Sequence, residues 1–337
     1  MNAAAPVGRP AIERHQIVDR DAWLALRREN INASETGIVC GAGGYGSPAE
    51  LYAEKKGLRP PLIDTGTLKR GRWGEAAVFE ALTDERPEWN VRRAKVYLRD
   101  PVLRIGATPD GFAIAPDRDG FGVVQTKMVS RSVFRAKWLV DPDAPIAEGE
   151  ARPPLFYQLQ TLTEELVSDC GWGVLAVVIN GEYDWTFRLF DVPRHPEAEA
   201  RILEDVAAFW RDWLDPGVMP PFDPKRDEAL IKILYPADDG TEIDLSADNR
   251  VAELVDDLIE KRAGRRRLEG EIGPIETELR GKLGPHTYGL LGDGRRIVAK
   301  AIHRKAYSVA ASDYRSLRIG KADTQPEEQG DDEQHRS

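Results

Sequence analysis

The chain has 337 residues, enough for about two domains of ordinary size. Hydrophobic residues make up 41% of it and charged residues 31%, which excludes a collagen-like or broadly disordered protein. Two cysteines, Cys40 and Cys170, are too few for a disulfide scaffold or a four-cysteine iron–sulfur cluster. The N-terminus has no apolar run of signal-peptide length, and the longest apolar stretch, residues 173–179, is too short to span a membrane. We therefore expect a protein of the reducing cytoplasm with no membrane partner.

The net charge of −10 conceals an uneven distribution. Residues 261–320 contain 14 lysines and arginines against 6 acidic residues, whereas residues 321–337 contain 2 against 6. A localised basic region permits contact with a polyanion, although a solvated helix face would have the same composition. The side chains that could follow a duplex backbone are Lys261, Arg262, Arg265, Arg266, Arg267, Arg295, Arg296, Lys300, Arg304 and Lys305.

Three helices are predicted in the first quarter of the chain. Helical spacing of apolar residues indicates one over residues 20–29. A glycine-rich segment at 41–46 has neither the P-loop ending nor the spacing of a dinucleotide-binding loop, so it favours a plain tight turn. Ser47 and Pro48 then form a helix start, and that helix is expected to run to about residue 56. The third helix is expected over residues 68–82.

The periodicity then changes to that of strands. Asp-Pro and Asp-Gly turn signals separate short strand-like runs, which fit a three-stranded antiparallel meander. These runs cover residues 95–98, 103–107, 112–115 and 122–127. After them we expect a helix over 153–168, a strand buried on both faces over 172–179, a strand over 183–190 and a helix over 197–214. This order of elements predicts an α/β fold.

The remaining residues are expected to form a separate C-terminal region. Four prolines in residues 216–224 indicate a linker, and apolar periodicity over 250–283 is interrupted by glycines and a proline, which favours a helical hairpin or an interrupted coiled coil over one rod. Its apolar stripe could be an oligomer seam or a dock for a partner. A β-hairpin over 288–304 should turn at residues 292–294. We therefore expect domains at 1–222 and 223–320, followed by a disordered acidic tail at 321–337.

Four polar residues lie at the edges of the predicted meander. Glu75 is on the preceding helix, Asp110 is in a Pro-Asp-Gly turn, and Gln125 and Lys127 share one face of a strand because strand side chains alternate with period two. Two strands and a helix can bring these four side chains into one pocket. Three oxygen donors and one ammonium group would meet there.

This set of groups suits a hard divalent cation. Mg²⁺ takes carboxylate and amide oxygens and keeps positions open for phosphate, and Mn²⁺ is an alternative. A metal ion can polarise a phosphodiester and lower the pKa of a bound water, and Lys127 could orient that water or offset charge in the transition state. The pattern indicates metal-assisted phosphodiester hydrolysis.

Each motif alone is weak evidence for a functional site, because Pro-Asp-Gly is usually a turn and Gln-x-Lys is usually a solvated strand end. Their order and spacing, however, resemble the lambda exonuclease and YqaJ-type viral recombinase family of the PD-(D/E)xK nuclease superfamily. The resemblance covers about residues 20–190. It is carried by Asp21-Ala22-Trp23 with Leu26-Arg27, Ala33-Ser34-Glu35, Gly71 to Glu75, Thr108-Pro109-Asp110-Gly111, Gln125-x-Lys127 and Gln158-Leu159-Gln160.

The resemblance implies a restriction-endonuclease-like fold with a mixed central sheet flanked by helices, and it implies roles for particular residues. Glu75, Asp110 and Gln125 would bind the metal, and Lys127 would serve the attacking water. The residues that would contact substrate are Arg27, Ser34 and Thr108, at a terminal 5′ phosphate, and Gln158 and Gln160, near the active site. For Arg27 and Ser34, a helix-end arginine and an N-cap serine are equally good interpretations.

One residue departs from the family pattern, which has an acid where this chain has Gln125. The amide oxygen can still coordinate, but the site loses one negative charge, so metal binding should be weaker and a two-metal site is disfavoured. Glutamine occurs at this place in parts of the superfamily, which favours a working enzyme. A catalytically silent DNA-binding relative remains an alternative.

By resemblance, the chain is expected to be a Mg²⁺-dependent exonuclease encoded by a phage or prophage. It would degrade one strand of a DNA duplex from 5′ to 3′ and leave a 3′ single strand for an annealing protein of the RecT or Bet kind. The same resemblance implies a homo-oligomer, specifically a ring-shaped trimer. A structure-specific or restriction-like endonuclease is the second enzymatic alternative, because the core does not determine where the cut falls.

Overall fold

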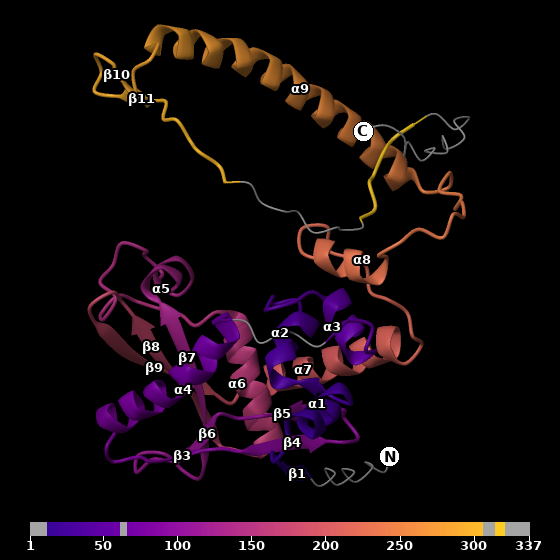
Figure 1. Ribbon diagram of the computed structural model, residues 1–337. Coiled ribbons are helices and arrows are strands. Elements are labelled where there is room, and N and C mark those ends of the chain that lie inside the picture. The colour runs from indigo at the N-terminus through magenta and orange to yellow at the C-terminus, as the bar shows by residue number, and fades with distance from the viewer. Residues whose placement is uncertain (1–11, 61–65, 306–313, 321–337) are drawn as a thin grey trace. The chain divides into compact units, whose positions relative to one another are not determined.

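The computed structural model describes residues 12–60, 66–305 and 314–320 (Figure 1). It divides into two compact units, Met1–Leu234 and Tyr235–Ser337. The predicted acidic tail, residues 321–337, lies outside the described residues. Within the described part of the chain, no helix has the length and apolar character needed to cross a membrane.

The central element of the first unit is a mixed five-stranded sheet. β7 and β8 pair in parallel, and every other neighbouring pair is antiparallel. In spatial order the strands are β3 (Asn90–Arg93), β6 (Gly111–Ile114), β7 (Gly122–Ser130), β8 (Trp172–Asn180) and β9 (Trp185–Pro193).

Helices cover both faces of this sheet. On one face α4 (Gly66–Glu85) packs against Val174, Ala176 and Val178 of β8, and on the other α6 (Leu155–Ser168) packs near Leu175, Val177 and Ile179. Residues of β8 alternate between two apolar layers because successive strand side chains point to opposite faces. The predicted α/β class, the mixed sheet with flanking helices and the fully buried strand are thus confirmed.

A smaller four-stranded sheet lies in the same unit, and it corrects the predicted meander. Its strands, in spatial order, are β1 (Glu13–Gln16), β4 (Val96–Asp100), β5 (Ile105–Ala107) and β2 (Ile31–Asn32). The four runs predicted as one meander are therefore divided, since β4 and β5 belong to this sheet and β6 and β7 to the larger one. The prediction was wrong because β1 and β2, which pair with β4 and β5, come from distant sequence that local turn signals cannot reveal.

The other helices of the first unit include those predicted near residues 20–29, 47–56 and 197–214, together with several short helices that were not predicted. The glycine segment is a turn with positive φ at Gly41, Gly43 and Gly44, a conformation that favours glycine. Ser47 and Glu50 form a capping box at the start of the next helix. The helices are α1 (Arg20–Arg28), a 3₁₀ turn (Ala33–Glu35), α2 (Thr36–Val39), α3 (Pro48–Lys55), α5 (Arg131–Lys137), α7 (Pro196–Phe209) with a π-turn (Trp210–Leu214), and α8 (Glu228–Leu234).

The proline-rich segment 216–224 precedes α8, and α8 is still part of the first unit. Leu230 of α8 is buried against Ala49 and Ala53 of α3. The compact unit therefore extends beyond that segment to Leu234.

The second unit contains one long helix, α9 (Asn249–Leu283), and the pair β10 (Tyr288–Leu290) and β11 (Arg296–Val298). The predicted β-hairpin is confirmed, with Gly294 in the left-handed region of its turn. The predicted break in the helix is wrong, because α9 continues through Pro274. Ion pairs four residues apart, such as Arg265–Glu269 and Glu276–Arg280, support the helix on both sides of that proline.

Candidate active site

Asp110 lies where the chain passes from the smaller sheet to the larger one, between β5 and β6. Its Oδ2 accepts hydrogen bonds from Gln125 Nε2 at 2.6 Å, from the Thr126 backbone N–H at 2.8 Å and from Thr126 Oγ1 at 2.7 Å. Asp110 is thereby anchored to β7 by a carboxylate that interacts with both faces of that strand.

Gln125 and Lys127 of β7 both face α6, as the strand period predicts. Gln125 Oε1 accepts a hydrogen bond from Gln160 Nε2 at 2.9 Å, and Lys127 Nζ donates to Gln160 Oε1 at 3.4 Å. The Lys127 ammonium also lies 4.9 Å from the ring centroid of Tyr157. Gln160 therefore joins the two predicted site residues of β7 through a single amide group.

A buried carboxylate that sequence reasoning missed belongs to the same network. Glu164 lies one turn after Gln160 on α6 and is 1% exposed, and its Oε1 accepts a hydrogen bond from Gln160 Nε2 at 3.0 Å. Among the described residues, Glu164 Oε2 has no hydrogen-bond partner. The available signal was the spacing of four residues from Gln160, which places both side chains on one helix face.

Burial and charge shift the pKa values of two groups in this network. Burial raises the pKa of Glu164 well above its usual range, and the charge of Asp110 raises it further. Burial lowers the pKa of Lys127, and the nearby carboxylates of Asp110, Glu164 and Glu75 oppose that shift. The ammonium of Lys127 is therefore desolvated and lies in the field of three acids.

Glu75 lies near this network, but no hydrogen bond among the described residues joins it to the other three predicted site residues. Its Oε1 accepts from Arg93 Nη2 at 2.7 Å, in a partly exposed ion pair. At Gly74, α4 approaches β7 so closely that a Cβ would come within 2.8 Å of Met128 Sδ. The structure thus joins Asp110, Gln125 and Lys127 in one network and places Glu75 beside it.

The described residues contain no group of three or more His, Cys, Asp or Glu side chains arranged to hold a metal ion. Gln125 contributes an amide, and its Nε2 rather than its oxygen faces Asp110. Rotation of that amide by 180° would exchange the two atoms. The carboxylates of Asp110 and Glu75, the Gln125 amide and the buried, unpartnered oxygen of Glu164 are nevertheless oxygen donors of the kind that a hard divalent cation prefers. In chemical type these donors suit such an ion, although the described residues do not bring three acidic side chains around one point.

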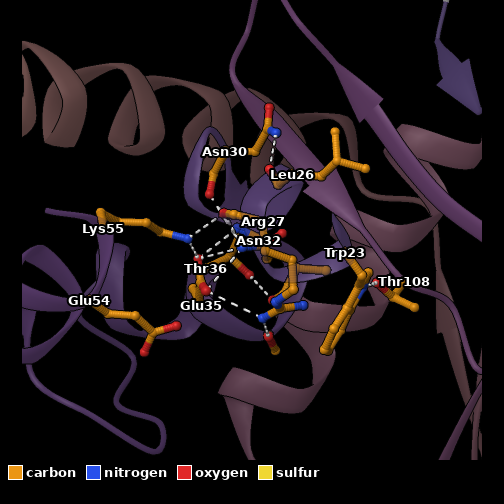
Figure 2. Close-up of polar contacts among 12 residues, drawn as sticks. Trp23, Leu26, Arg27, Asn30, Asn32, Glu35, Thr36, Glu54, Lys55 and Thr108 are labelled. Carbon is orange, nitrogen blue, oxygen red and sulfur yellow. Dashed lines mark hydrogen bonds and ion pairs between the residues drawn. The ribbon is translucent and has the colours of Figure 1, made fainter. Parts of the chain in front are cut away.

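Arg27 and Thr108 form a second cluster with Trp23 (Figure 2), and Ser34 joins it through Arg27. Arg27 Nη2 donates to Ser34 Oγ at 3.2 Å, and its guanidinium lies 4.9 Å from the Trp23 ring centroid. Trp23 Nε1 donates to Thr108 Oγ1 at 3.1 Å. Trp23 therefore links Thr108 to Arg27, Arg27 in turn binds Ser34, and Thr108 is two residues from Asp110.

Glu35 and Lys55 both contact Arg27 of this cluster (Figure 2). Lys55 Nζ contacts Glu35 Oε2 at 2.6 Å and donates to the Arg27 backbone oxygen at 2.8 Å, while Arg27 Nη2 lies 3.3 Å from Glu35 Oε1. Burial alone would raise the pKa of Glu35, but the charges of Lys55 and Arg27 and the Asn32 N–H hold it below its usual value. Sequence reasoning missed Lys55, which comes from a different helix.

Gln158, also predicted to contact substrate, has its amide at the start of α6 and not in either cluster. Its Nε2 donates to the Pro153 backbone oxygen at 2.6 Å, so it stabilises the start of α6. Gln160, two residues later, faces the site instead, because a step of two residues along a helix turns the side chain to another side.

Comparison with known proteins agrees with the resemblance found in the motifs. Residues 22–170 match the model of the YqaJ-like viral recombinase domain. The uncharacterized protein YqaJ of Bacillus subtilis (strain 168) is 24% identical over 294 residues, which are 84% of this chain and 84% of that protein. An alignment of 294 residues is longer than the first unit, so it extends into the second.

Two solved structures are also similar. An alkaline exonuclease (LHK-Exo) from Laribacter hongkongensis aligns with a TM-score of 0.42 and 18% identity over 57% of this chain and 92% of its own. A phage related exonuclease from Haemophilus somnus 129PT aligns with a TM-score of 0.40 and 13% identity over 56% and 95%. With TM-scores below 0.5, neither alignment contributes to the family assignment. The residues that match the YqaJ-like viral recombinase domain, 22–170, hold both clusters described above.

Proposed function

We propose that this chain is a divalent-metal-dependent nuclease that degrades DNA from duplex ends. One observation carries the proposal: Asp110, Gln125 and Lys127 form one network beside a buried carboxylate oxygen that lacks a partner among the described residues. A desolvated lysine among acids that fit a hard cation is suited to phosphodiester hydrolysis. The YqaJ-like domain supports this function, since it contains the whole network.

In this proposal the residues of the site have separate roles in binding the metal, orienting the water and positioning the lysine. Asp110, Gln125 and Glu75 would hold Mg²⁺ or Mn²⁺, which when bound polarises the phosphodiester and lowers the pKa of water. Lys127 orients the attacking water and offsets charge on the phosphate in the transition state. Gln160 keeps the Lys127 ammonium in place, and the Tyr157 ring covers it.

The second cluster would select the DNA end. Arg27 offers a guanidinium, and Ser34 and Thr108 offer hydroxyl groups, to a terminal 5′ phosphate. Strand degradation would then run from 5′ to 3′ and leave a 3′ single strand for an annealing protein of the RecT or Bet kind. We propose that this serves phage or prophage recombination in a bacterial host cytoplasm, with a ring-shaped homo-oligomer as the working form.

Release of nucleotides from a linear duplex with 5′ phosphates and Mg²⁺ tests the proposal. We expect Asp110→Ala and Lys127→Ala to lower the rate about 10³-fold or more, because each removes a group at the reacting phosphate. Lys56→Ala, an exposed lysine of the same unit, is the matched control and should keep the wild-type rate. Undiminished release in either site variant contradicts the proposal.

A catalytically silent DNA-binding relative is the second candidate, favoured by the amide nitrogen that Gln125 turns toward Asp110. The same assay with Gln125→Glu separates the two functions. Nuclease activity in wild type supports the enzyme, whereas activity that appears only in Gln125→Glu supports the silent relative. Cleavage of covalently closed circular DNA by wild type would instead indicate an endonuclease.

The basic residues of α9 are proposed to add DNA affinity through phosphate contacts. Arg265, Arg266 and Arg267 are exposed, although Arg265 and Arg267 also pair with Glu269 and Glu271. We expect the triple change of these arginines to Gln to weaken duplex binding several-fold at low salt and to reduce the slope of log affinity against log salt by about 2. Unchanged affinity at low salt would mean that this basic region is only a solvated helix face.

A further inference from the structure

We propose that Tyr45, in the glycine segment 41–46, is a nucleic-acid contact on which an unpaired base of the strand entering the active site stacks. The inference rests on the nuclease proposed above, and it gives a role to a segment that neither cluster of the site includes. The ligand is a base of frayed or single-stranded DNA, because such a base has a free aromatic face, whereas a base inside a duplex is covered by its neighbours.

The Tyr45 ring is the group that would meet the base. The residue is 81% exposed, although its hydroxyl group forms a hydrogen bond with the hydroxyl of Tyr157, which is only 6% exposed. The tip of the side chain is thus held at a buried group while most of the ring remains in solvent. Single exposed aromatic side chains are common on protein surfaces, so the position and the fixation of this ring carry the argument.

Contacts on two sides fix the segment that carries Tyr45. Phe156, at the start of α6, lies edge-on to the Tyr45 ring, with 5.8 Å between the ring centroids. The Gly44 backbone oxygen accepts a hydrogen bond from Arg226 Nη2 at 2.9 Å. A ring that is ordered before its ligand arrives loses little conformational entropy on binding, which favours a binding role.

Tyr157 connects this ring to the candidate active site. The Tyr157 ring centroid is 4.9 Å from Lys127 Nζ and 6.4 Å from the Tyr45 ring centroid. Tyr157 therefore contacts both Tyr45 and the lysine proposed to serve the attacking water. A nucleotide carries its base on the sugar next to its phosphate, so a phosphate held near Lys127 brings a base into the neighbourhood of Tyr45.

The sequence around Tyr45 leaves the ring uncovered. Gly44 and Gly46 flank it, so neither neighbour has a side chain that could lie over the ring. Every base has a π face, so a stacking contact of this kind accepts all four bases, and removing the aromatic side chain from such a contact weakens binding about fivefold or more. The contact would therefore add affinity for DNA ends without base specificity.

Phe121 provides a matched control among the exposed aromatic side chains of the first unit. It is 61% exposed and immediately precedes β7. Six residues separate it from Lys127, which corresponds to about 20 Å along an extended strand. Removal of the Phe121 ring therefore deletes exposed aromatic surface at a distance from the site.

The experiment measures binding of the full-length protein to DNA ends by fluorescence anisotropy, with a chelator present to prevent metal-dependent cleavage. Two 5′-phosphorylated duplexes with a short unpaired 5′ end are compared, one with all its bases and one with abasic nucleotides in the unpaired end. We expect wild type to bind the intact probe about tenfold more tightly than the abasic probe, and Tyr45→Ala to bind the two alike. Phe121→Ala should show the same preference as wild type.

Two further measurements separate stacking from a structural role of the tyrosine hydroxyl. Tyr45→Phe keeps the ring and loses the hydrogen bond to Tyr157, and it should retain most of the preference for the intact probe. The fluorescent base 2-aminopurine in the unpaired end reports stacking directly, since its emission should fall on binding to wild type and not on binding to Tyr45→Ala. Circular dichroism establishes that each variant is folded.

Equal affinity of wild type for the two probes overturns the inference, as does a preference that survives in Tyr45→Ala or is lost equally in Phe121→Ala. A loss in Tyr45→Phe as large as that in Tyr45→Ala assigns the effect to the hydroxyl group and also overturns it. These outcomes leave the nuclease proposal intact, provided that wild type binds the intact probe and degrades it when Mg²⁺ is added. If wild type binds neither probe, the proposed function fails and the inference fails with it.

Discussion

Two buried glutamates in the first unit differ in the groups that surround their carboxylates. Glu35, 7% exposed, has Lys55, Arg27 and the Asn32 backbone N–H around its carboxylate (Figure 2). Glu164, 1% exposed, has one hydrogen bond to an amide and one oxygen without a hydrogen-bond partner among the described residues. The first carboxylate is neutralised by two cations of the chain, whereas the second keeps an oxygen without a hydrogen-bond donor among the described residues.

The largest effect is expected from removing the charge of Glu35. Glu35→Gln leaves Lys55 and Arg27 without their anion, and breaking a buried pair in this way costs about 3–5 kcal/mol in the free energy of unfolding. Urea denaturation at pH 7 measures it. The control is Glu54→Gln, whose ion pair with Arg59 is more exposed, and we expect it to cost less than about 1 kcal/mol. A loss below 1 kcal/mol for Glu35→Gln would mean that the cluster is not a compensated ion pair.

The same variant has a defined pH dependence. The pKa of Glu35 is lowered in the folded protein, so its stabilising contribution is present above the ordinary glutamate pKa of 4.5 and is lost as the pH falls through the lower folded value. The difference in unfolding free energy between wild type and Glu35→Gln should therefore be full at pH 6–7 and should narrow toward pH 3. A difference that stayed constant over this range would contradict the assignment.

A smaller effect of opposite sign is expected from the same substitution at Glu164. In the absence of divalent ions, Glu164→Gln removes a buried carboxylate that lacks sufficient compensation, so the variant should be at least as stable as wild type, by up to about 2 kcal/mol. Thermal or urea unfolding with a chelator present measures this. Destabilisation by more than about 1 kcal/mol would show that Glu164 is needed to hold the fold.

The smallest effect on stability is expected at Ser34, whose hydroxyl accepts one partly exposed hydrogen bond from Arg27. Ser34→Ala should lower the free energy of unfolding by less than about 1 kcal/mol. If this cluster binds a terminal phosphate, the variant should also lose several-fold of its preference for 5′-phosphorylated over 5′-hydroxyl duplex ends. Competition between the two substrates measures that preference, and an unaltered preference would restrict Ser34 to a structural role.

Much of the fold was predictable from local pattern. The helices around residues 20–28 and 48–55, the buried strand β8 and the C-terminal hairpin follow from periodicity, capping and turn signals, which act over a few residues. The meander was mispredicted because strand pairing depends on contacts between segments that are far apart in the sequence. The break in α9 was mispredicted because glycine and proline weaken a helix without always ending it, and α9 continues through Pro274.

The candidate site was predictable in part for the same reason. Asp110, Gln125 and Lys127 lie close together because one turn and one strand determine their placement, and the period of a strand is a local property. Glu75 instead pairs with Arg93, and Gln158 donates to the Pro153 carbonyl. Sequence spacing does not identify either partner.

The sequence by itself determined the order of elements, the motif residues and their face on β7, because these depend on covalent spacing and backbone period. Only the tertiary structure decided that Asp110 lies at the junction of two sheets, that Lys55 neutralises Glu35 and that Glu164 is buried against Gln160. The physical reason is that desolvation and charge compensation depend on which groups surround a side chain in space, and those groups come from distant parts of the chain.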